Sequence, residues 1–301
     1  MSYRDKVRPI LITGAAGLLG SSLVPYLRML EHRVITQARS AKADFRIDLC
    51  DRDRTWEMLT CVQPSLIINL VGLTNVDLCE DQVNDAFLAN TATVESMVSW
   101  MELGRGDCHL IHISTDQVYD NKGPHTENQI NIRNNYALSK YAGELVAARV
   151  SSTILRTNFV GRSMVSHRSS FTDWVYNSLT SKEAVQVLDD VYFSPLSITT
   201  LVQKIESVIQ LKPRGIYNLG SHNGMSKADF VFAFAECLGL ATSGITRIHA
   251  DQAKFLKAYR PRDMRMDSAK FENTLGVRLP ELRDLIQPLA REYDDDTRFN
   301  S

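Results

Sequence analysis

The sequence predicts an α/β fold with a doubly wound parallel sheet, joined to a smaller C-terminal domain. Short apolar runs rich in β-branched residues alternate with amphipathic stretches from residue 9 to residue 156. Two of these runs, 65–72 and 108–114, are largely apolar, as are strands that helices cover on both faces. A glycine-rich turn, residues 14–20, follows the first run. This alternation favours a parallel sheet with right-handed crossovers.

Each element has its own signal in the sequence. Asp51 or Asp53 can cap the second helix, and Gly104 can end the third in the left-handed conformation. In the first half the expected strands are residues 9–13, 33–37, 65–72, 108–114 and 152–156, and the expected helices are 17–30, 51–62, 80–104 and 135–150. In the second half we expect strands at 185–190 and 215–220, and helices at 197–210, 226–239 and 281–292.

The same pattern predicts how the chain is divided. Residues 1–158 are expected to form a dinucleotide-binding Rossmann domain, to which residues 196–220 return. Residues 159–195 and 221–301 are expected to form the substrate-binding domain. We expect this second domain to close a cleft over the carboxyl edge of the sheet.

Composition narrows the class of protein. The 301 residues include 34 basic and 35 acidic side chains, a balance that argues against nucleic-acid or anionic-membrane partners. No apolar run reaches the ~20 residues that span a bilayer, and the N-terminus lacks a signal peptide's apolar region. The five cysteines are scattered without a CxxC pair. This pattern predicts free thiols and no zinc site, and we expect the protein to lie in the reducing cytoplasm.

The glycine turn TGAAGLLG (13–20) predicts a dinucleotide site. Gly14 allows the tight turn, Gly17 lets the backbone approach a pyrophosphate, and Gly20 lets the helix pack close to the sheet. The N-terminus of the helix then faces the phosphates with N–H donors and its positive dipole end. A turn with purely structural glycines is the alternative.

The end of the second strand bears on which nucleotide binds. An acid there would bind a ribose 2′-hydroxyl and repel a 2′-phosphate, but the chain reads Ala38-Arg39-Ser40. Arg39 suits a phosphate, so we expect NADPH, with NADH still open, unless Arg39 is only a solvated surface charge. Asp48 and Leu49 are placed to line the adenine pocket, or Asp48 begins the cap of the next helix.

Tyr136 and Lys140 predict acid–base chemistry. They lie four residues apart and share one face of a helix. A Lys ammonium beside a phenol favours the phenolate, which makes Tyr a competent acid or base for a carbonyl and alcohol pair. Ser114 and Thr115 end the strand 108–114 in the crevice outside the sheet, where a hydroxyl can bond the same oxygen. A surface Tyr–Lys pair is the alternative.

Together these features resemble the extended short-chain dehydrogenase/reductases, and within them the dTDP-4-dehydrorhamnose reductase group. The supporting stretches extend along nearly the whole chain. They are TGAAGLLG (13–20), NLVGLTNVDLCE (69–80), ISTDQVYD (113–120), NNYALSKYAGE (134–144), ILRTNFVG (154–161), LDDVYFSP (188–195), GIYNLG (215–220) and RPRDMRMD (260–267).

The resemblance implies a role for each matching residue. Thr115 would polarise the C4 carbonyl with help from Ser114. Tyr136 would give the proton, and Lys140 would hold Tyr136 and the nicotinamide ribose. The residues expected to bind the cofactor are Gly14, Ala16, Gly17, Leu18, Leu19, Arg39, Ser40, Asp48, Leu49, Leu70, Val71 and Gly72, with Tyr136 and Lys140. The residues expected to bind the substrate are Thr74, Gln117, Asn158, Phe159 and Arg260.

Some positions depart from the group. Gln117 replaces the usual aromatic after Ser-Thr-Asp, and Phe159 stands where the reductases often have Trp. Ser22 occupies the position where some members carry a Glu used in a magnesium-bridged dimer. We therefore expect no metal, while a homodimer stays open.

The resulting hypothesis is an NADPH-dependent 4-keto reductase of a nucleotide-activated deoxysugar. The expected substrate is dTDP-4-dehydro-L-rhamnose, which implies dTDP-rhamnose and polysaccharide biosynthesis. A UDP-linked 4-keto amino-deoxysugar is the closest variant. Two rivals remain: an epimerase or dehydratase that retains NAD, and a regulatory relative that is not an enzyme.

Overall fold

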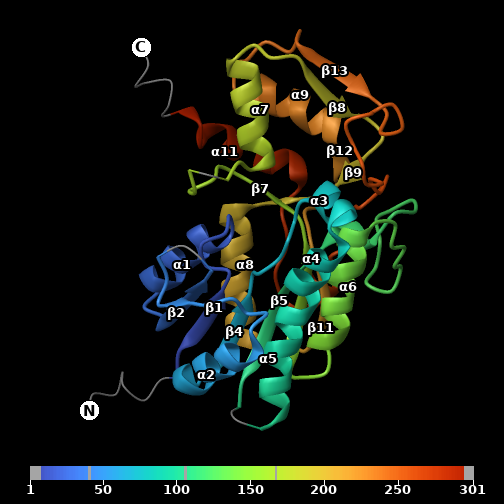
Figure 1. Cartoon of the computed structure of the whole chain (residues 1–301). Helices are drawn as coiled ribbons and strands as arrows, with labels where there is room; N and C mark the ends of the chain where they lie inside the picture. Colours follow the sequence, from blue (N-terminus) through green and yellow to red (C-terminus); the bar gives the residue numbers. More distant parts are fainter. Residues whose placement is uncertain (1–7, 40–41, 105–106, 167, 295–301) are drawn as a thin grey trace. The chain divides into compact units, whose positions relative to one another are not determined.

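A computed structural model describes residues 8–39, 42–104, 107–166 and 168–294 (Figure 1). The chain divides into two compact units, each described here by itself. Unit 1 contains Met1–Thr115, Asn134–Arg156 and Val202–Tyr217, and unit 2 contains Asp116–Arg133, Thr157–Leu201 and Asn218–Ser301. The domain boundaries expected from the sequence are not decided by this division and stay a prediction.

Unit 1 is built on the doubly wound sheet. Seven strands lie in the order β11-β6-β5-β4-β1-β2-β3. The bounds are β1 (Ile10–Thr13), β2 (Val34–Ala38), β3 (Phe45–Arg46), β4 (Leu66–Asn69), β5 (His109–Thr115), β6 (Ser152–Thr157) and β11 (Gly215–Leu219). The pairs β1–β2, β1–β4, β4–β5 and β2–β3 are parallel. The predicted α/β class is confirmed. The short strand β3 was not expected from the sequence.

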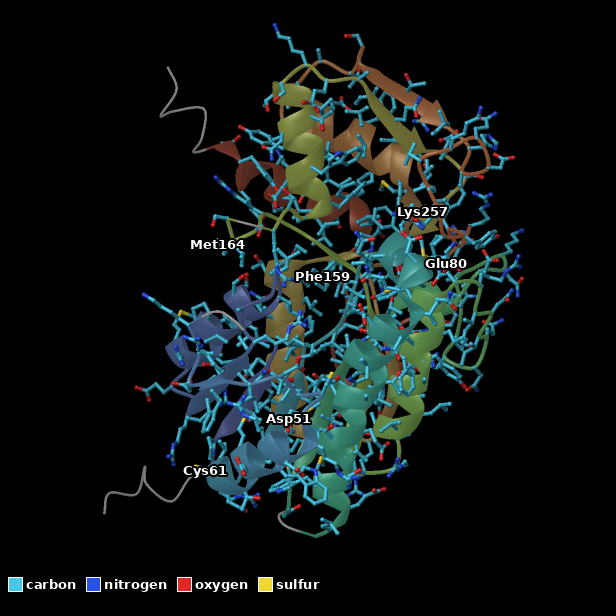
Figure 2. The ribbon with its side chains drawn as sticks, in the orientation of Figure 1. Asp51, Cys61, Glu80, Phe159, Met164 and Lys257 are labelled. Carbon is cyan, nitrogen blue, oxygen red and sulfur yellow. The ribbon has the colours of Figure 1, made fainter. Side chains whose placement is uncertain are left out.

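Helices surround this sheet. They are α1 (Gly20–Met29), α2 (Arg52–Val62), α3 (Val76–Asp81), α4 (Val83–Phe87), α5 (Thr93–Glu102), α6 (Asn135–Ala147) and α8 (Ile198–Leu211). A core of buried side chains from the sheet, α2, α5 and α6 includes Leu11, Ile67, Met97 and Trp100. Asp51, labelled in Figure 2, caps α2 by accepting a hydrogen bond of 3.1 Å from the Arg54 N–H.

The prediction of a single long helix over 80–104 is wrong. The structure has α3, a break at Gln82, then α4, a π-helical segment η2 (Leu88–Ala92) and α5. The expected helix over 17–30 also starts late, because residues 14–19 form the turn and α1 begins at Gly20. Gly104 has φ +65°, the left-handed conformation expected at this helix end.

Unit 2 has shorter strands and an aromatic core. Its elements are η3 (Asp116–Val118), β7 (Phe159–Val160), α7 (Phe171–Thr180), β8 (Val185–Leu188), β9 (Tyr192–Phe193), β10 (Leu196–Ser197), β12 (Met225–Ser226), α9 (Lys227–Cys237), β13 (Ile245–Ile248), α10 (Ala269–Leu275) and α11 (Leu282–Arg291). The rings of Phe193 and Phe230 pack edge to face at 5.5 Å. Across the described ranges, we find no helix with both the length and the apolarity to cross a membrane.

Candidate active site

The glycine turn requires its first and third glycines for physical reasons. Gly14 has φ +69°, and a Cβ there would lie 3.0 Å from the backbone of Leu70 and Val71. A Cβ on Gly20 would lie 2.4 Å from the carbonyl oxygen of Ala15, which leaves no room for any side chain. These two glycines therefore set the close approach of turn, helix and sheet.

The turn presents N–H donors where α1 begins. The N–H groups of Gly14 and Gly17 are already used, by the Gln37 side chain at 3.1 Å and the Gly14 carbonyl at 2.9 Å. By contrast, the N–H groups of Ala16, Leu18 and Leu19 have no acceptor in the described part of the chain. Three unused donors at a helix N-terminus fit a phosphate group. Among the turn residues predicted to bind the cofactor, Ala16, Leu18 and Leu19 are thus the ones whose backbone N–H groups are available.

Gln37 was not singled out from the sequence, yet it holds this turn in place. It is 1% exposed, its Oε1 accepts from Gly14, and its Nε2 donates to the Ile47 carbonyl at 2.7 Å. Its carbonyl oxygen also accepts from the Ala15 N–H at 3.0 Å. The signal that could have found Gln37 was an amide side chain near the end of a strand expected to be buried.

The predicted adenine-side residues differ in exposure. Arg39 is exposed directly after β2, Asp48 is exposed, and Ser40 lies outside the described residues. Asp48 accepts from the Cys50 N–H at 3.0 Å, so it forms a local turn while Asp51 caps α2. Leu49 is buried in the core of unit 1. Leu70, Val71 and Gly72 are half-buried, and Thr74 is exposed.

Tyr136 and Lys140 lie buried on α6, so the surface pair considered from the sequence does not occur. Tyr136 is 7% exposed and packs in a small apolar cluster with Cys79 and Ala86. The helix begins at Asn134, whose side chain accepts from the Ala137 N–H at 2.8 Å. Packing and capping together hold the phenol ring in one orientation.

The Lys140 ammonium connects α6 to the end of β5. Its Nζ donates to the Ile113 carbonyl oxygen at 2.7 Å, and a Cβ built on Gly72 would lie 3.8 Å from it. Burial lowers the pKa of Lys140 to about 8, although Glu144 acts in the opposite direction. The ends of β4 and β5 thus meet at this cation. Its partner on β5, Ile113, comes one residue before Ser114 and two before Thr115.

The hydroxyl of Ser114 is engaged by a buried ion pair. It donates to Glu144, whose carboxylate also binds Arg156 at 2.6 and 2.9 Å. Both side chains of the ion pair are fully buried. In this structure the Ser114 proton is held by Glu144, whereas Thr115 ends the strand with 4% exposure. Glu144 continues the Tyr136–Lys140 face of α6 and could have been noticed from its spacing.

The π-helical segment η2 places Asn90 against this site. The Asn90 side chain accepts from the Leu73 N–H at 2.8 Å and donates to the Ser139 hydroxyl at 2.9 Å. A Cβ on Gly143 would lie 2.4 Å from the Asn90 carbonyl oxygen, so α6 and η2 pack with no room for a side chain at this position. Asn90 therefore joins the loop after β4 to α6.

His112 is a packing residue rather than a proton carrier. It is fully buried, and its Nδ1 lies 3.1 Å from the Asn69 amide nitrogen. Burial, and then the charge of Lys140, hold the pKa of His112 well below its ordinary range. Its Nε2 has no hydrogen-bond partner among the residues that the structure describes.

The remaining predicted substrate residues lie in unit 2. Asn158 donates to the Asp116 carboxylate at 2.7 Å, and Phe159 pairs with Leu196 across β7 and β10. Gln117, Asn158, Phe159 and Arg260 are all half-buried. Partial exposure leaves them accessible to a ligand, and their roles stay a prediction.

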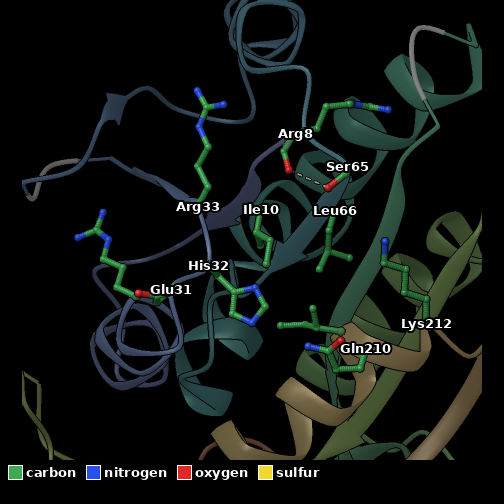
Figure 3. A pocket seen from close by; sticks show the side chains of 11 residues that line it. Arg8, Ile10, Glu31, His32, Arg33, Ser65, Leu66, Gln210 and Lys212 are labelled. Atoms are coloured by element: carbon green, nitrogen blue, oxygen red, sulfur yellow. Dashed lines mark hydrogen bonds between the residues drawn. The ribbon is translucent and has the colours of Figure 1, made fainter. Parts of the chain in front are cut away.

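A cavity of about 720 Å³ in unit 1 lies elsewhere, at the amino ends of β1 and β4 (Figure 3). Arg8, Arg28, Arg33 and Lys212 line it. The Arg8 guanidinium is already bonded to the carbonyls of Gln63 and Pro64, at 3.0 and 2.7 Å. None of the predicted site residues lines this cavity.

Comparison with known proteins agrees with this geometry. Residues 8–294 match the family described as RmlD substrate binding domain. The chain belongs to this family. The RmlD match confirms the resemblance to dTDP-4-dehydrorhamnose reductases and the extended short-chain dehydrogenase/reductases. The chain is an NAD(P)-dependent oxidoreductase of a nucleotide-sugar reductase family.

Individual relatives cover almost the whole chain. A Haloferax volcanii protein named probable low-salt glycan biosynthesis reductase Agl14 is 28% identical over 94% of this chain and 98% of its own. A solved Sulfolobus tokodaii structure, titled a hypothetical dTDP-4-dehydrorhamnose reductase, is 29% identical with a TM-score of 0.82, covering 92% and 98%. The Rattus norvegicus methionine adenosyltransferase 2 subunit beta is 26% identical over 90% and 83%.

Proposed function

We propose that this chain reduces the C4 ketone of a nucleotide-activated deoxysugar with NADPH, and that dTDP-4-dehydro-L-rhamnose is its substrate. The observation that carries this proposal is the buried Tyr136–Lys140 pair beside the strand end that bears Thr115. The unused donors of Ala16, Leu18 and Leu19 and the exposed Arg39 fit a dinucleotide with a 2′-phosphate.

Each residue has a task in the reaction. The bound nicotinamide supplies a hydride to the C4 carbon. Tyr136 would give its phenolic proton to the oxygen of that carbonyl, which becomes the hydroxyl of the product. Thr115 would donate a hydrogen bond to the same oxygen as negative charge develops on it. Lys140 would stabilise the phenolate left on Tyr136.

Positioning supplies much of the expected rate, because no covalent intermediate is needed. Asn90 and Ile113 hold α6 against the ends of β4 and β5, so Tyr136 and Lys140 need little reordering when substrate binds. Asn158, Phe159 and Gln117 would contact the sugar, and Arg260 its diphosphate.

The experiment is a reductase assay with a panel of substrates. The protein is mixed with NADPH and either dTDP-4-dehydro-L-rhamnose or a UDP-linked 4-keto amino-deoxysugar, and the absorbance of NADPH is followed. Faster oxidation with the dTDP sugar supports the proposed substrate. Oxidation only with the UDP sugar keeps the reaction and changes the substrate, and no oxidation with either rejects the proposal. Stoichiometric NAD released from the denatured protein would favour the epimerase or dehydratase rival.

A further inference from the structure

A fully buried ion pair lies beside the end of β5. Glu144 on α6 and Arg156 on β6 have no exposed side-chain surface. The Arg156 guanidinium binds the carboxylate as a fork, with Nη2 at 2.6 Å from Oε2 and Nε at 2.9 Å from Oε1. The hydroxyl of Ser114, the residue before the last of β5, donates to the same carboxylate. Three elements of unit 1 therefore meet at one carboxylate.

The pair occupies positions where apolar side chains would be expected. Ile154, two residues before Arg156 on the same face of β6, belongs to the apolar core of unit 1, as does Ala147, three residues after Glu144 on α6. An ion pair buried in such a place often stabilises a fold less than apolar side chains of similar volume, because both charges lose their water. A fully satisfied polar network does, however, fix one geometry of the elements that it joins. The pair is therefore better explained by the geometry that it fixes than by the stability that it adds.

That geometry concerns the contact between α6 and β5. Lys140 and Glu144 lie one turn apart on α6 and bond to two consecutive residues of β5. Lys140 Nζ donates to the Ile113 carbonyl oxygen at 2.7 Å, and the Glu144 carboxylate accepts from the Ser114 hydroxyl. Bonds at two successive turns fix both the distance and the rotation of the helix relative to the end of the strand. Thr115 follows directly, so the same two contacts set its position.

The proton of the Ser114 hydroxyl is committed to Glu144. A hydroxyl has one proton to donate, and a carboxylate paired with a guanidinium only accepts hydrogen bonds. The bond from a hydroxyl to a carboxylate is charge-assisted and stronger than a bond to a neutral ketone. A ketone oxygen needs a donor, which Ser114 cannot supply while Glu144 holds its proton. Ser114 therefore differs in role from Thr115.

We propose that Glu144 and Arg156 are positioning residues of the active site, which hold Ser114 through its hydroxyl, fix the end of β5 and so direct the Thr115 hydroxyl to the ketone oxygen. Ser114 itself makes no bond to the substrate. This inference rests on the proposed function, which assigns the ketone to Thr115. The two neighbouring hydroxyls thus have separate tasks, one toward α6 and one toward the substrate.

A double-mutant cycle between Ser114 and Thr115 tests this assignment in the full-length protein. The substrates are NADPH and dTDP-4-dehydro-L-rhamnose, or the UDP-linked sugar if the protein reduces that one. Thr115→Val should lower kcat about 10²- to 10³-fold, as does the loss of one donor to a developing oxyanion. Ser114→Ala should lower kcat about tenfold in the wild type but less than about twofold in the Thr115→Val background, because it acts only through Thr115. The KM for the sugar and the Kd for NADPH should change less than about twofold.

A second variant removes the ion pair itself. Glu144→Leu with Arg156→Met takes away both charges together, so that neither is left alone in the core. We expect the same loss of kcat, about tenfold, and the same dependence on Thr115. Ser96→Ala is the matched control, because Ser96 is 6% exposed and its hydroxyl donates to the Ala92 carbonyl at 3.1 Å on α5. Its kcat should change less than about twofold.

Losses that multiply in the double variant Ser114→Ala with Thr115→Val overturn the inference, because Ser114 would then bond the ketone itself or act only on stability. Unchanged kcat in Ser114→Ala, or a similar loss in Ser96→Ala, also overturns it. Hydrogen exchange of residues 109–118 separates this inference from the proposed function. If the wild type reduces neither sugar, the reductase proposal fails and exchange decides the positioning role. Exchange about 3- to 10-fold faster in Ser114→Ala than in the wild type and Ser96→Ala supports that role, and an unchanged rate overturns it.

Discussion

Lys140 Nζ donates a 2.7 Å hydrogen bond to the carbonyl oxygen of Ile113, the residue directly before the Ser114–Thr115 pair. One buried cation thus joins the helix that bears Tyr136 to the strand that bears Thr115. In the proposed reaction this relationship links the proposed proton donor to the group expected to polarise the ketone, and it predicts that activity requires the charge of Lys140.

Activity should therefore depend on the protonation of Lys140. Its pKa in the folded protein is about 8 because of burial, below the ~10.4 of an unfolded lysine. As pH rises through about 8, the folded protein loses the charge of Lys140, whereas the unfolded chain still keeps it, so kcat/KM should fall. Between about 8 and 10.4 the unfolded chain binds the extra proton, so this residue's contribution to stability rises with pH.

The pH profile of kcat/KM checks this prediction. A Lys140→Arg variant that keeps measurable activity should retain its charge and move the alkaline limb to higher pH. Identical alkaline limbs in the wild type and the variant would show that another group controls the profile.

The contact between Gly143 and Asn90 should be sensitive to a single methyl group. Alanine at 143 would place its Cβ 2.4 Å from the Asn90 carbonyl oxygen, so α6 must shift and carry Tyr136 and Lys140 with it. We expect Gly143→Ala to lower kcat/KM at least about tenfold and stability by about 1–3 kcal/mol. Gly244→Ala is the control, because its φ is not positive and its Cβ would make only an ordinary contact of 3.6 Å with the Glu183 carbonyl oxygen; equal activity losses in the two variants would contradict the prediction.

Removing one partner of the buried Glu144–Arg156 pair should lower the free energy of unfolding much more than removing one partner of an exposed pair. Arg156→Met leaves a carboxylate uncompensated in the core and should cost about 3–5 kcal/mol in urea unfolding. Arg149→Met, which breaks the exposed pairs with Glu95 and Glu102, should cost less than about 1 kcal/mol. The double variant Glu144→Leu with Arg156→Met should recover part of the loss, and similar costs for both single variants would refute the distinction.

Arg39 should determine the preference between the two dinucleotides. Removing its guanidinium by Arg39→Met takes away a partner for the 2′-phosphate, so the KM for NADPH should rise about tenfold while that for NADH stays nearly constant. Steady-state kinetics with each cofactor give the answer, with the exposed Arg46 replaced by Met as control. Equal effects on both cofactors would mean that Arg39 does not contact the phosphate.

Sequence patterns predicted the strands and helices of unit 1 well where burial alone decides them. The apolar runs at 65–72 and 108–114 became β4 and β5, and the 135–150 pattern became α6. The helix expected over 80–104 is interrupted at Gln82 and contains the π-helical segment η2 around Asn90. Asn90 bonds Leu73 and Ser139, residues distant in sequence, and no local signal shows such partners.

The candidate site was predictable only in part, for the same reason. The four-residue spacing of Tyr136 and Lys140 places both side chains on one helix face, and this could be predicted directly from the sequence. The Ser114–Glu144–Arg156 cluster comes from the three elements β5, α6 and β6. Only the fold shows these groups together.

The measurement closest to the central claim follows the hydride itself. The protein is supplied with NADPH deuterated at the transferable position of the nicotinamide, and dTDP-4-dehydro-L-rhamnose is added as substrate. We predict a dTDP-linked product with one deuterium on C4, seen by mass spectrometry and NMR, and a loss of product formation of about 10²- to 10⁴-fold in Tyr136→Phe. A product without deuterium at C4, or equal turnover by Tyr136→Phe, would contradict hydride transfer with Tyr136 as the proton donor.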